Sequence, residues 1–137
     1  MRSAYSEIAN NINLLLKIYM VDIDMNEANR KVNGSASFRF LNLTDEEAKE
    51  LKSAILSVEF GVHYETKRNV GSIKLVDSSL VVKIDEFRRK HSIKAIDCDV
   101  FVSIYSDRND ETWRAPKAVN YIINIVNCPI VFSYTSK

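Results

Sequence analysis

The sequence predicts a single α+β domain over residues 1–137, built on an antiparallel sheet of about four or five strands with helices packed on one face. Two patterns carry this prediction. Several segments alternate apolar and polar residues with a period of two, as half-buried strands do, and fewer segments repeat apolar residues at helical spacing. With 137 residues, 3 glycines and 2 prolines, the chain has the length of one domain and no composition typical of a linker.

The beginning of the chain predicts a helix, a strand and a turn. Residues 3–11 fit a short helix, and residues 12–26 alternate loosely enough to be interpreted as a strand. The polar segment 27–35 follows and contains Asn33-Gly34, a dipeptide typical of tight turns. We therefore expect the chain to reverse there before the next strand.

The middle of the chain alternates strands and helices. Residues 35–43 alternate as a strand, and Thr44-Asp-Glu-Glu47 is a capping box that predicts a short helix from Asp45 to about Leu51. Residues 54–65 show the clearest period-two alternation in the chain and predict a long strand. The apolar face of this strand would consist of Leu56, Val58, Phe60, Val62 and Tyr64.

A second helix is expected after a turn and a short strand. Residues 66–72 read as the turn, and residues 72–76 as the strand. Residues 77–92 repeat apolar positions at helical spacing and end in basic residues, which suit the negative end of a helix dipole. The apolar face of this helix would consist of Leu80, Val81, Ile84 and Phe87.

The last third predicts a strand, a polar loop and a helix. Residues 93–106 alternate strongly, residues 107–115 are polar, and Pro116 is well placed to open a helix over 116–127. One face of the strand would hold Ile96, Cys98, Val100, Val102 and Ile104, and the other Asp97, Asp99, Phe101, Ser103 and Tyr105. The apolar stripe of the helix is Val119, Ile122, Ile123 and Val126.

The sequence predicts no enzyme, no cofactor and no metal site. The three glycines stand apart, so they form no glycine-rich phosphate loop. The two histidines, His63 and His91, lack further ligands at the spacing that a metal needs. In Asp97-Cys98-Asp99, strand geometry turns the thiol away from both carboxylates, and their charges oppose a thiolate.

Charge and cysteine usage favour a cytoplasmic protein with reduced thiols. The net charge of +1, from 19 basic and 18 acidic residues, gives no general attraction to nucleic acid or to membranes. Two small basic clusters, Lys67-Arg68 and Arg88–His91, leave nucleic-acid binding as a weaker alternative. No apolar run reaches the length of about 18 residues that membrane insertion needs, and Cys98 and Cys128 are expected to be small buried side chains.

The order of elements resembles the SecB export-chaperone family, including its relatives associated with toxin–antitoxin systems. The resemblance rests on short segments: a helical lead into "NLLLKIYMVDIDM", "SASFRFLNL" before the long strand, "CDVFVSIYS" before a polar loop, and "AVNYIINIVN" breaking into "CPIVFSY". Family members continue after this Tyr into a second long helix, whereas the present sequence ends at Lys137, and its region 66–93 is longer.

This resemblance implies a non-enzymatic chaperone that holds unfolded or nascent polypeptides without ATP, as a homo-oligomer. Phe101 and Tyr105 stand among polar residues, so they are either covered by helices or exposed as a binding surface. The resemblance implies the second possibility, with a client groove formed by Phe101, Tyr105, Ile130, Phe132 and Tyr134. The stripe Val119, Ile122, Ile123 and Val126 would then lie on the sheet or at a subunit contact.

A second reading assigns the chain to a different class of binding protein. It would be an adaptor or inhibitor, encoded by a virus or a mobile element, that binds one folded partner. Its small size, the absence of a catalytic motif in the sequence and the longer region 66–93 suit this reading. The number of different partners distinguishes the two readings, because a chaperone holds many unfolded proteins and an adaptor captures one.

Overall fold

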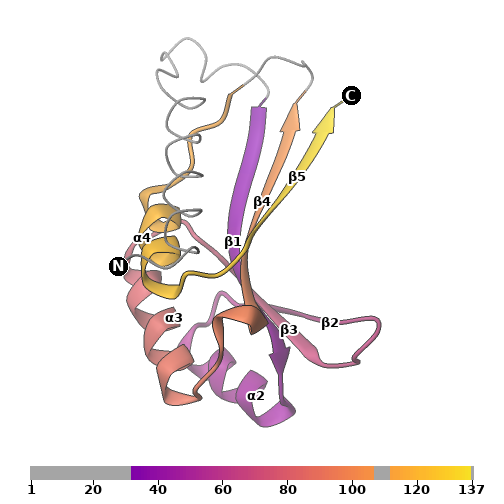
Figure 1. Cartoon of the computed structure of the whole chain (residues 1–137), viewed down its shortest axis with the longest axis vertical. Coiled ribbons are helices and arrows are strands. Elements are labelled where there is room, and N and C mark those ends of the chain that lie inside the picture. The colour runs from indigo at the N-terminus through magenta and orange to yellow at the C-terminus, as the bar shows by residue number, and fades with distance from the viewer. Residues whose placement is uncertain (1–31, 107–111, 137) are drawn as a thin grey trace, which may run out of the picture.

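The computed structural model describes residues 32–106 and 112–136, which form the expected α+β fold. One sheet has the strand order β2-β3-β1-β4-β5, with β1 (Val32–Leu43), β2 (Glu59–Val62), β3 (Asn69–Lys74), β4 (Cys98–Ser106) and β5 (Ile130–Ser136). The helices of the described residues lie along one side of this sheet (Figure 1): α2 (Asp45–Ala54), α3 (Ser79–Lys90) and α4 (Lys117–Val126). The opposite side, called the open face below, has no described helix on it (Figure 1).

The sheet is mostly antiparallel, but β4 and β5 run parallel. The central strand β1 pairs antiparallel with β3 and with β4, and β2 pairs antiparallel with β3. The chain leaves β4 and returns to β5 through α4, which is the kind of helical crossover that joins parallel strands. The prediction of an antiparallel sheet was therefore right for all pairs of described strands except this one.

The core lies between the helices and one face of the sheet. Phe38 and Phe40 of β1 pack edge to face with ring centroids 4.9 Å apart, and Phe40 packs in the same way on Phe87 of α3 at 5.3 Å. The expected apolar face of α3 is confirmed, because Val81, Ile84 and Phe87 are buried and Leu80 packs against them. A buried aromatic side chain is worth about 2–3 kcal/mol, so these contacts fix α3 on β1.

The capping box of α2 is confirmed, but the strand expected after it is shorter. Thr44 Oγ1 accepts a hydrogen bond from the Glu47 backbone N–H at 3.1 Å, and Glu47 Oε1 accepts one from the Thr44 N–H at 2.9 Å. The helix continues to Ala54, and only Glu59–Val62 of the expected strand 54–65 pairs as β2. The reason lies in three buried residues spaced by four and three positions, Leu51, Ile55 and Val58, which continue the helical face past the helix end.

The expected turn at Asn33-Gly34 is wrong. Both residues lie inside β1, where Asn33 pairs with Tyr105 and Gly34 with Ile104 of β4. A Cβ atom at Gly34 would come within 2.2 Å of the Trp113 indole. Glycine is therefore needed at this position because an aromatic ring packs onto the strand, and not because the chain turns.

Two further boundaries differ from the expectation. β4 begins at Cys98 instead of residue 93, because Ala95–Asp97 form a short 3₁₀ turn that leaves Ile96 exposed. β3 begins at Asn69, inside the segment 66–72 that was expected to be a turn. The turn itself is tighter, and Lys67 closes it with a left-handed φ of 60°.

Some expected elements lie outside the described residues. These are the helix over 3–11, the strand over 12–26 and residues 107–111 of the polar loop. Within the described ranges, every helix is too short or too polar to cross a membrane.

Candidate functional site

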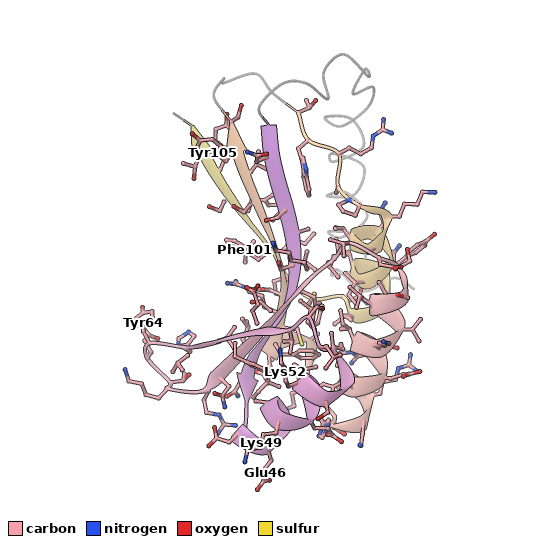
Figure 2. The ribbon with its side chains drawn as sticks, turned by 180° about the vertical axis from the view of Figure 1, so that it is seen from behind. Glu46, Lys49, Lys52, Tyr64, Phe101 and Tyr105 are labelled. Carbon is pink, nitrogen blue, oxygen red and sulfur yellow. The ribbon has the colours of Figure 1, made fainter. Side chains whose placement is uncertain are left out.

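The five residues expected to form one client groove divide over two faces of the sheet. Neighbouring residues in register share a face, and Phe101 is in register with Val131, whereas Val102 is in register with Phe132 and Ile104 with Tyr134. Phe101 and Tyr105 therefore lie on the open face along β4 (Figure 2). Ile130, Phe132 and Tyr134 lie on the face that carries the helices.

Phe101 is engaged within the chain. The guanidinium of Arg39 lies over its ring, 4.5 Å from the ring centroid, and Phe101 is half-buried. The same guanidinium donates two hydrogen bonds to Asp99, from Nε to Oδ1 at 2.7 Å and from Nη2 to Oδ2 at 2.5 Å. Tyr105, by contrast, is 37% exposed. Phe101 thus supports an ion pair on the open face and offers only part of its ring to a partner.

The β5 residues form an unusual sheet edge. Phe132 is 50% and Tyr134 51% exposed, Val131 is exposed on the other face, and Ile130 packs against the core. Strand β5 has the sequence IVFSYTS, without a charged residue or a proline, and no described strand pairs with its outer side. Natural edge strands usually carry lysine, proline or a bulge that prevents pairing with other chains. β5 therefore forms an uncharged edge of the described sheet.

The backbone of β5 alternates between pairing inward and facing outward. Val100 N–H donates to the Pro129 carbonyl at 2.9 Å, so the odd-numbered residues from 129 onward pair with β4. The N–H and C=O of Ile130 and Phe132 consequently face the outer side of the strand. This side is where an added strand would form its hydrogen bonds.

The four residues expected on the sheet or at a subunit contact lie in the core. All four are at most 5% exposed in the single chain and belong to the cluster beneath α4: Val119, Ile122, Ile123 and Val126. Of the two alternatives that the sequence left open, packing on the chain's own sheet is therefore the one observed. A second copy of the chain would have to use other side chains.

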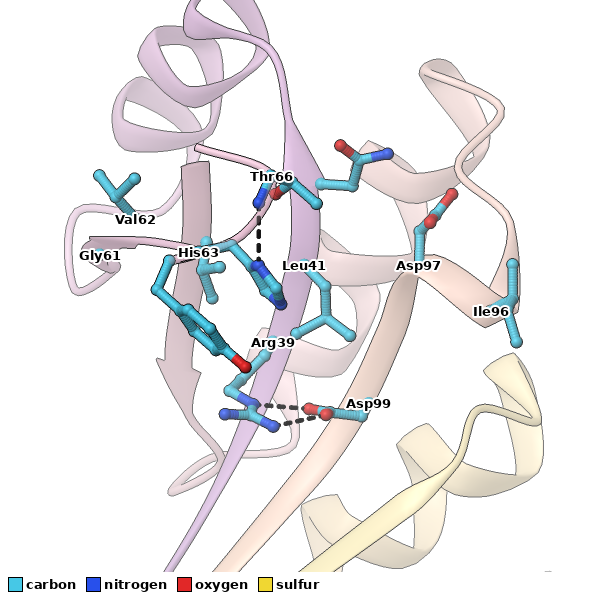
Figure 3. A pocket seen from close by; sticks show the side chains of 12 residues that line it. Arg39, Leu41, Gly61, Val62, His63, Thr66, Ile96, Asp97 and Asp99 are labelled. Carbon is cyan, nitrogen blue, oxygen red and sulfur yellow. Dashed lines mark hydrogen bonds and ion pairs between the residues drawn. The ribbon is translucent and has the colours of Figure 1, made fainter. Parts of the chain in front are cut away.

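A pocket on the open face was not expected from the sequence. Its volume is about 660 Å³, and it lies between the β2–β3 hairpin and the ends of β1 and β4 (Figure 3). The lining residues are Arg39, Leu41, Asn42, Gly61, Val62, His63, Tyr64, Thr66, Val70, Ile96, Asp97 and Asp99. A β-bulge between Phe40 and Leu43 turns Leu41 and Asn42 toward this surface, and bulges of this kind occur next to functional sites. The bulge depends on pairing register, which the sequence pattern does not reveal.

The cysteine and histidine side chains that were considered for catalysis or metal binding are either buried or held by polar contacts within the chain. Cys98 and Cys128 are free and buried, and burial raises the pKa of each thiol from its usual 9.0 to about 12. His63 Nδ1 accepts the backbone N–H groups of Glu65 and Thr66 at 3.2 and 3.3 Å, which holds the ring against the hairpin turn. Among the described residues, no group of three His, Cys, Asp or Glu side chains is placed to hold a metal ion.

His91 joins two helices. It lies at the end of α3, and its imidazole nitrogens contact the carboxylates of Glu47 and Glu50 on α2. It therefore caps the helix end, as the position of the basic cluster indicated, and also links α3 to α2.

No protein-family model, curated protein or solved structure matches the chain. The resemblance to SecB-like chaperones accordingly stays a prediction, and the function is argued below from the geometry.

Proposed function

We propose that this protein binds extended segments of unfolded polypeptides as an additional strand along the outer edge of β5, without ATP and without covalent chemistry. The observation that carries the proposal is the edge itself, seven residues free of charge and proline, with Phe132 and Tyr134 each about half exposed. This edge also accounts for three of the residues that the sequence assigned to client binding, Ile130, Phe132 and Tyr134.

Strand addition suits a protein that must hold many different clients. The backbone of the added segment supplies the hydrogen bonds, and these do not depend on its sequence. Alternate side chains of the added segment would lie above and below the edge, beside Phe132 on one face and Val131 on the other. Apolar contacts of this kind contribute about 25 cal/mol for each Å² removed from water. The division of the expected groove over two faces is therefore compatible with binding at one edge.

The test measures light scattering of a reduced, chemically unfolded model protein after dilution, with and without this chain. We expect aggregation to be suppressed near a stoichiometric ratio. Phe132→Pro removes the outward N–H together with the ring, and proline is tolerated on an edge strand. Phe132→Val removes the ring and keeps the N–H, so it should suppress aggregation better than Phe132→Pro.

The result that contradicts the proposal is equally defined. If the folded wild-type chain does not suppress aggregation, or if both Phe132 variants act as the wild type does, strand addition at β5 is not the function. Melting curves of both variants control for loss of the fold.

A second candidate is an adaptor or inhibitor that binds one folded partner. The open-face pocket favours it, because a fixed charge such as that of Asp97 discriminates between partners, whereas a backbone edge does not. Chains that capture a single species from lysate, and that leave unfolded proteins to aggregate, would support this candidate. For either candidate we propose a cytoplasmic location, supported by two free, buried thiols.

A further inference from the structure

The open-face pocket has apolar walls that would suit the hydrocarbon part of a long side chain. Leu41 from β1, Val62 and Val70 from the β2–β3 hairpin, and Ile96 before β4 all line it. Val62 and Ile96 are well exposed, so much apolar surface is still in contact with water. Lysine and arginine side chains cover such surface with their methylene groups while the charged end stays at the rim.

The charges around the pocket leave one carboxylate uncompensated. The lining residues include Arg39, Asp97 and Asp99, and the first and last of these form a bidentate ion pair. Asp97 is half-buried, and no hydrogen bond or ion pair joins its carboxylate to another described side chain. Figure 3 shows Asp97 on the opposite side of the pocket from His63, separate from the Arg39–Asp99 pair. A cation entering the pocket would therefore find an available anionic partner.

The hairpin adds two rings on the other wall. His63 and Tyr64 stack with ring centroids 5.4 Å apart and an angle of 9° between their planes. The turn that carries them is held by hydrogen bonds from His63 N–H to the Arg68 carbonyl at 2.9 Å and from Lys67 N–H to the His63 carbonyl at 2.8 Å. The face of a tyrosine ring attracts cations, and the fixed turn keeps Tyr64 beside the pocket.

Nothing in the described part of the chain requires a glycine at position 61. Its φ is not positive, and a Cβ atom built on it meets no atom within 4 Å. Glycine in the middle of a strand lowers stability and often marks a place where another molecule approaches the backbone. Gly61 lines the pocket together with its pairing partner Val70, so a larger side chain at position 61 would extend into the pocket.

We infer that the open-face pocket binds a lysine or arginine side chain of a protein partner, with Asp97 pairing the charge and the apolar walls covering the stem. This site extends on the open face from the β2–β3 hairpin to the start of β4, and none of its lining residues belongs to β5. The inference goes beyond the proposed function and does not rest on it, since either an unfolded client or a folded partner can present a basic side chain.

The test titrates the isotopically labelled full-length chain with the peptide acetyl-Ser-Ser-Arg-Ser-Ser-amide and follows backbone NMR shifts. We expect the amides of Gly61, His63 and Asp97 to move, and the same peptide with norleucine in place of arginine to bind more weakly. Asp97→Asn keeps the shape of the side chain and should raise the Kd by roughly three- to tenfold. Gly61→Val should abolish the shifts and leave the melting temperature unchanged or higher, because valine favours strands.

Glu86→Gln is the matched control, since Glu86 is an exposed carboxylate on α3 and does not line the pocket. It should bind the arginine peptide as the wild type does, and so should Phe132→Pro if the two sites are separate. The inference is overturned if the norleucine peptide binds equally well, if Asp97→Asn binds with the wild-type Kd, or if no peptide shifts these amides. None of these results changes what is expected for strand addition at β5.

Discussion

Asp99 keeps a carboxylate almost fully out of water, at 4% exposure, because Arg39 donates two hydrogen bonds to it. A buried ion pair adds little net stability compared with apolar residues, but the loss of one partner leaves a buried charge without compensation. The pair therefore fixes the side chains of β1 and β4 relative to each other at the edge of the open-face pocket.

Arg39→Ala should lower the free energy of unfolding by about 2–3 kcal/mol, somewhat less than for a fully buried pair because the arginine is partly exposed. Urea denaturation measures this change. Asp99→Asn in the Arg39→Ala background removes the orphaned charge and should recover part of the loss. If the double variant is as unstable as the sum of the single variants, the two side chains do not act as a pair.

The two cysteines should be inert in the folded protein. With a thiol pKa of about 12 for both Cys98 and Cys128, only about one molecule in ten thousand carries the thiolate at pH 8. A thiol reagent such as DTNB should react with neither residue until denaturant is added, and then with both. Rapid modification of the native protein would contradict the burial of these residues.

The contact between α2 and α3 is made by charged residues at the helix ends. Lys90 and His91 at the end of α3 contact Glu50 of α2, and the hydrogen bond from Lys90 is the main cause that holds the pKa of Glu50 below its usual 4.5. A carboxylate with a lowered pKa stabilises the folded state above its usual pKa, and this contribution is lost as the pH falls through the lowered value.

The free energy of unfolding should consequently fall between about pH 6 and pH 3, and Glu50→Gln should show a smaller fall over the same range. Chemical denaturation at a series of pH values measures both slopes. Lys83→Gln, on the exposed surface of α3, serves as a charge-removal control that should keep the wild-type slope. Equal slopes for wild type and Glu50→Gln would show that the helix contact does not depend on this carboxylate.

The sequence predicted correctly those elements that depend on residues close to one another in the chain. The capping box at Thr44 and the spacing of Val81, Ile84 and Phe87 indicated two helices correctly, because each depends on residues within a few positions. The prediction of a strand over residues 54–58 was wrong, because the apolar residues of this segment fit both helical and alternating spacing. The parallel direction of β5 and the bulge after Phe40 depend on pairing partners that are distant in sequence.

The difference between near and distant determinants also explains which of the proposed binding surfaces could be predicted from the sequence. The sequence assigned Phe132 and Tyr134 to client binding only through the resemblance to SecB-like chaperones, and their place on an edge strand depends on pairing with β4. The open-face pocket was missed because it joins residues from β1, the hairpin and the start of β4, which only the register brings together. Gly61 was the available signal, an isolated glycine in an alternating segment.

At the scale of the described fold, the helices cover one face of the sheet and leave the two surfaces that we propose for binding uncovered (Figure 1). One is the outer edge of β5, and the other is the open-face pocket, which extends from the β2–β3 hairpin to the start of β4. An extended chain can cross a five-stranded sheet, because neighbouring strands are about 4.8 Å apart and each extended residue spans about 3.3 Å. One polypeptide is therefore long enough to reach both surfaces.

Hydrogen exchange of the backbone amides, measured with and without a chemically unfolded model protein, tests the central claim most directly. If an added strand forms at β5, the outward-facing amide of Phe132 should exchange more slowly in the complex, while the inward-facing amide of Val131 changes little. Binding that leaves exchange at Phe132 unchanged, or that protects only residues of another element, would contradict strand addition at this edge.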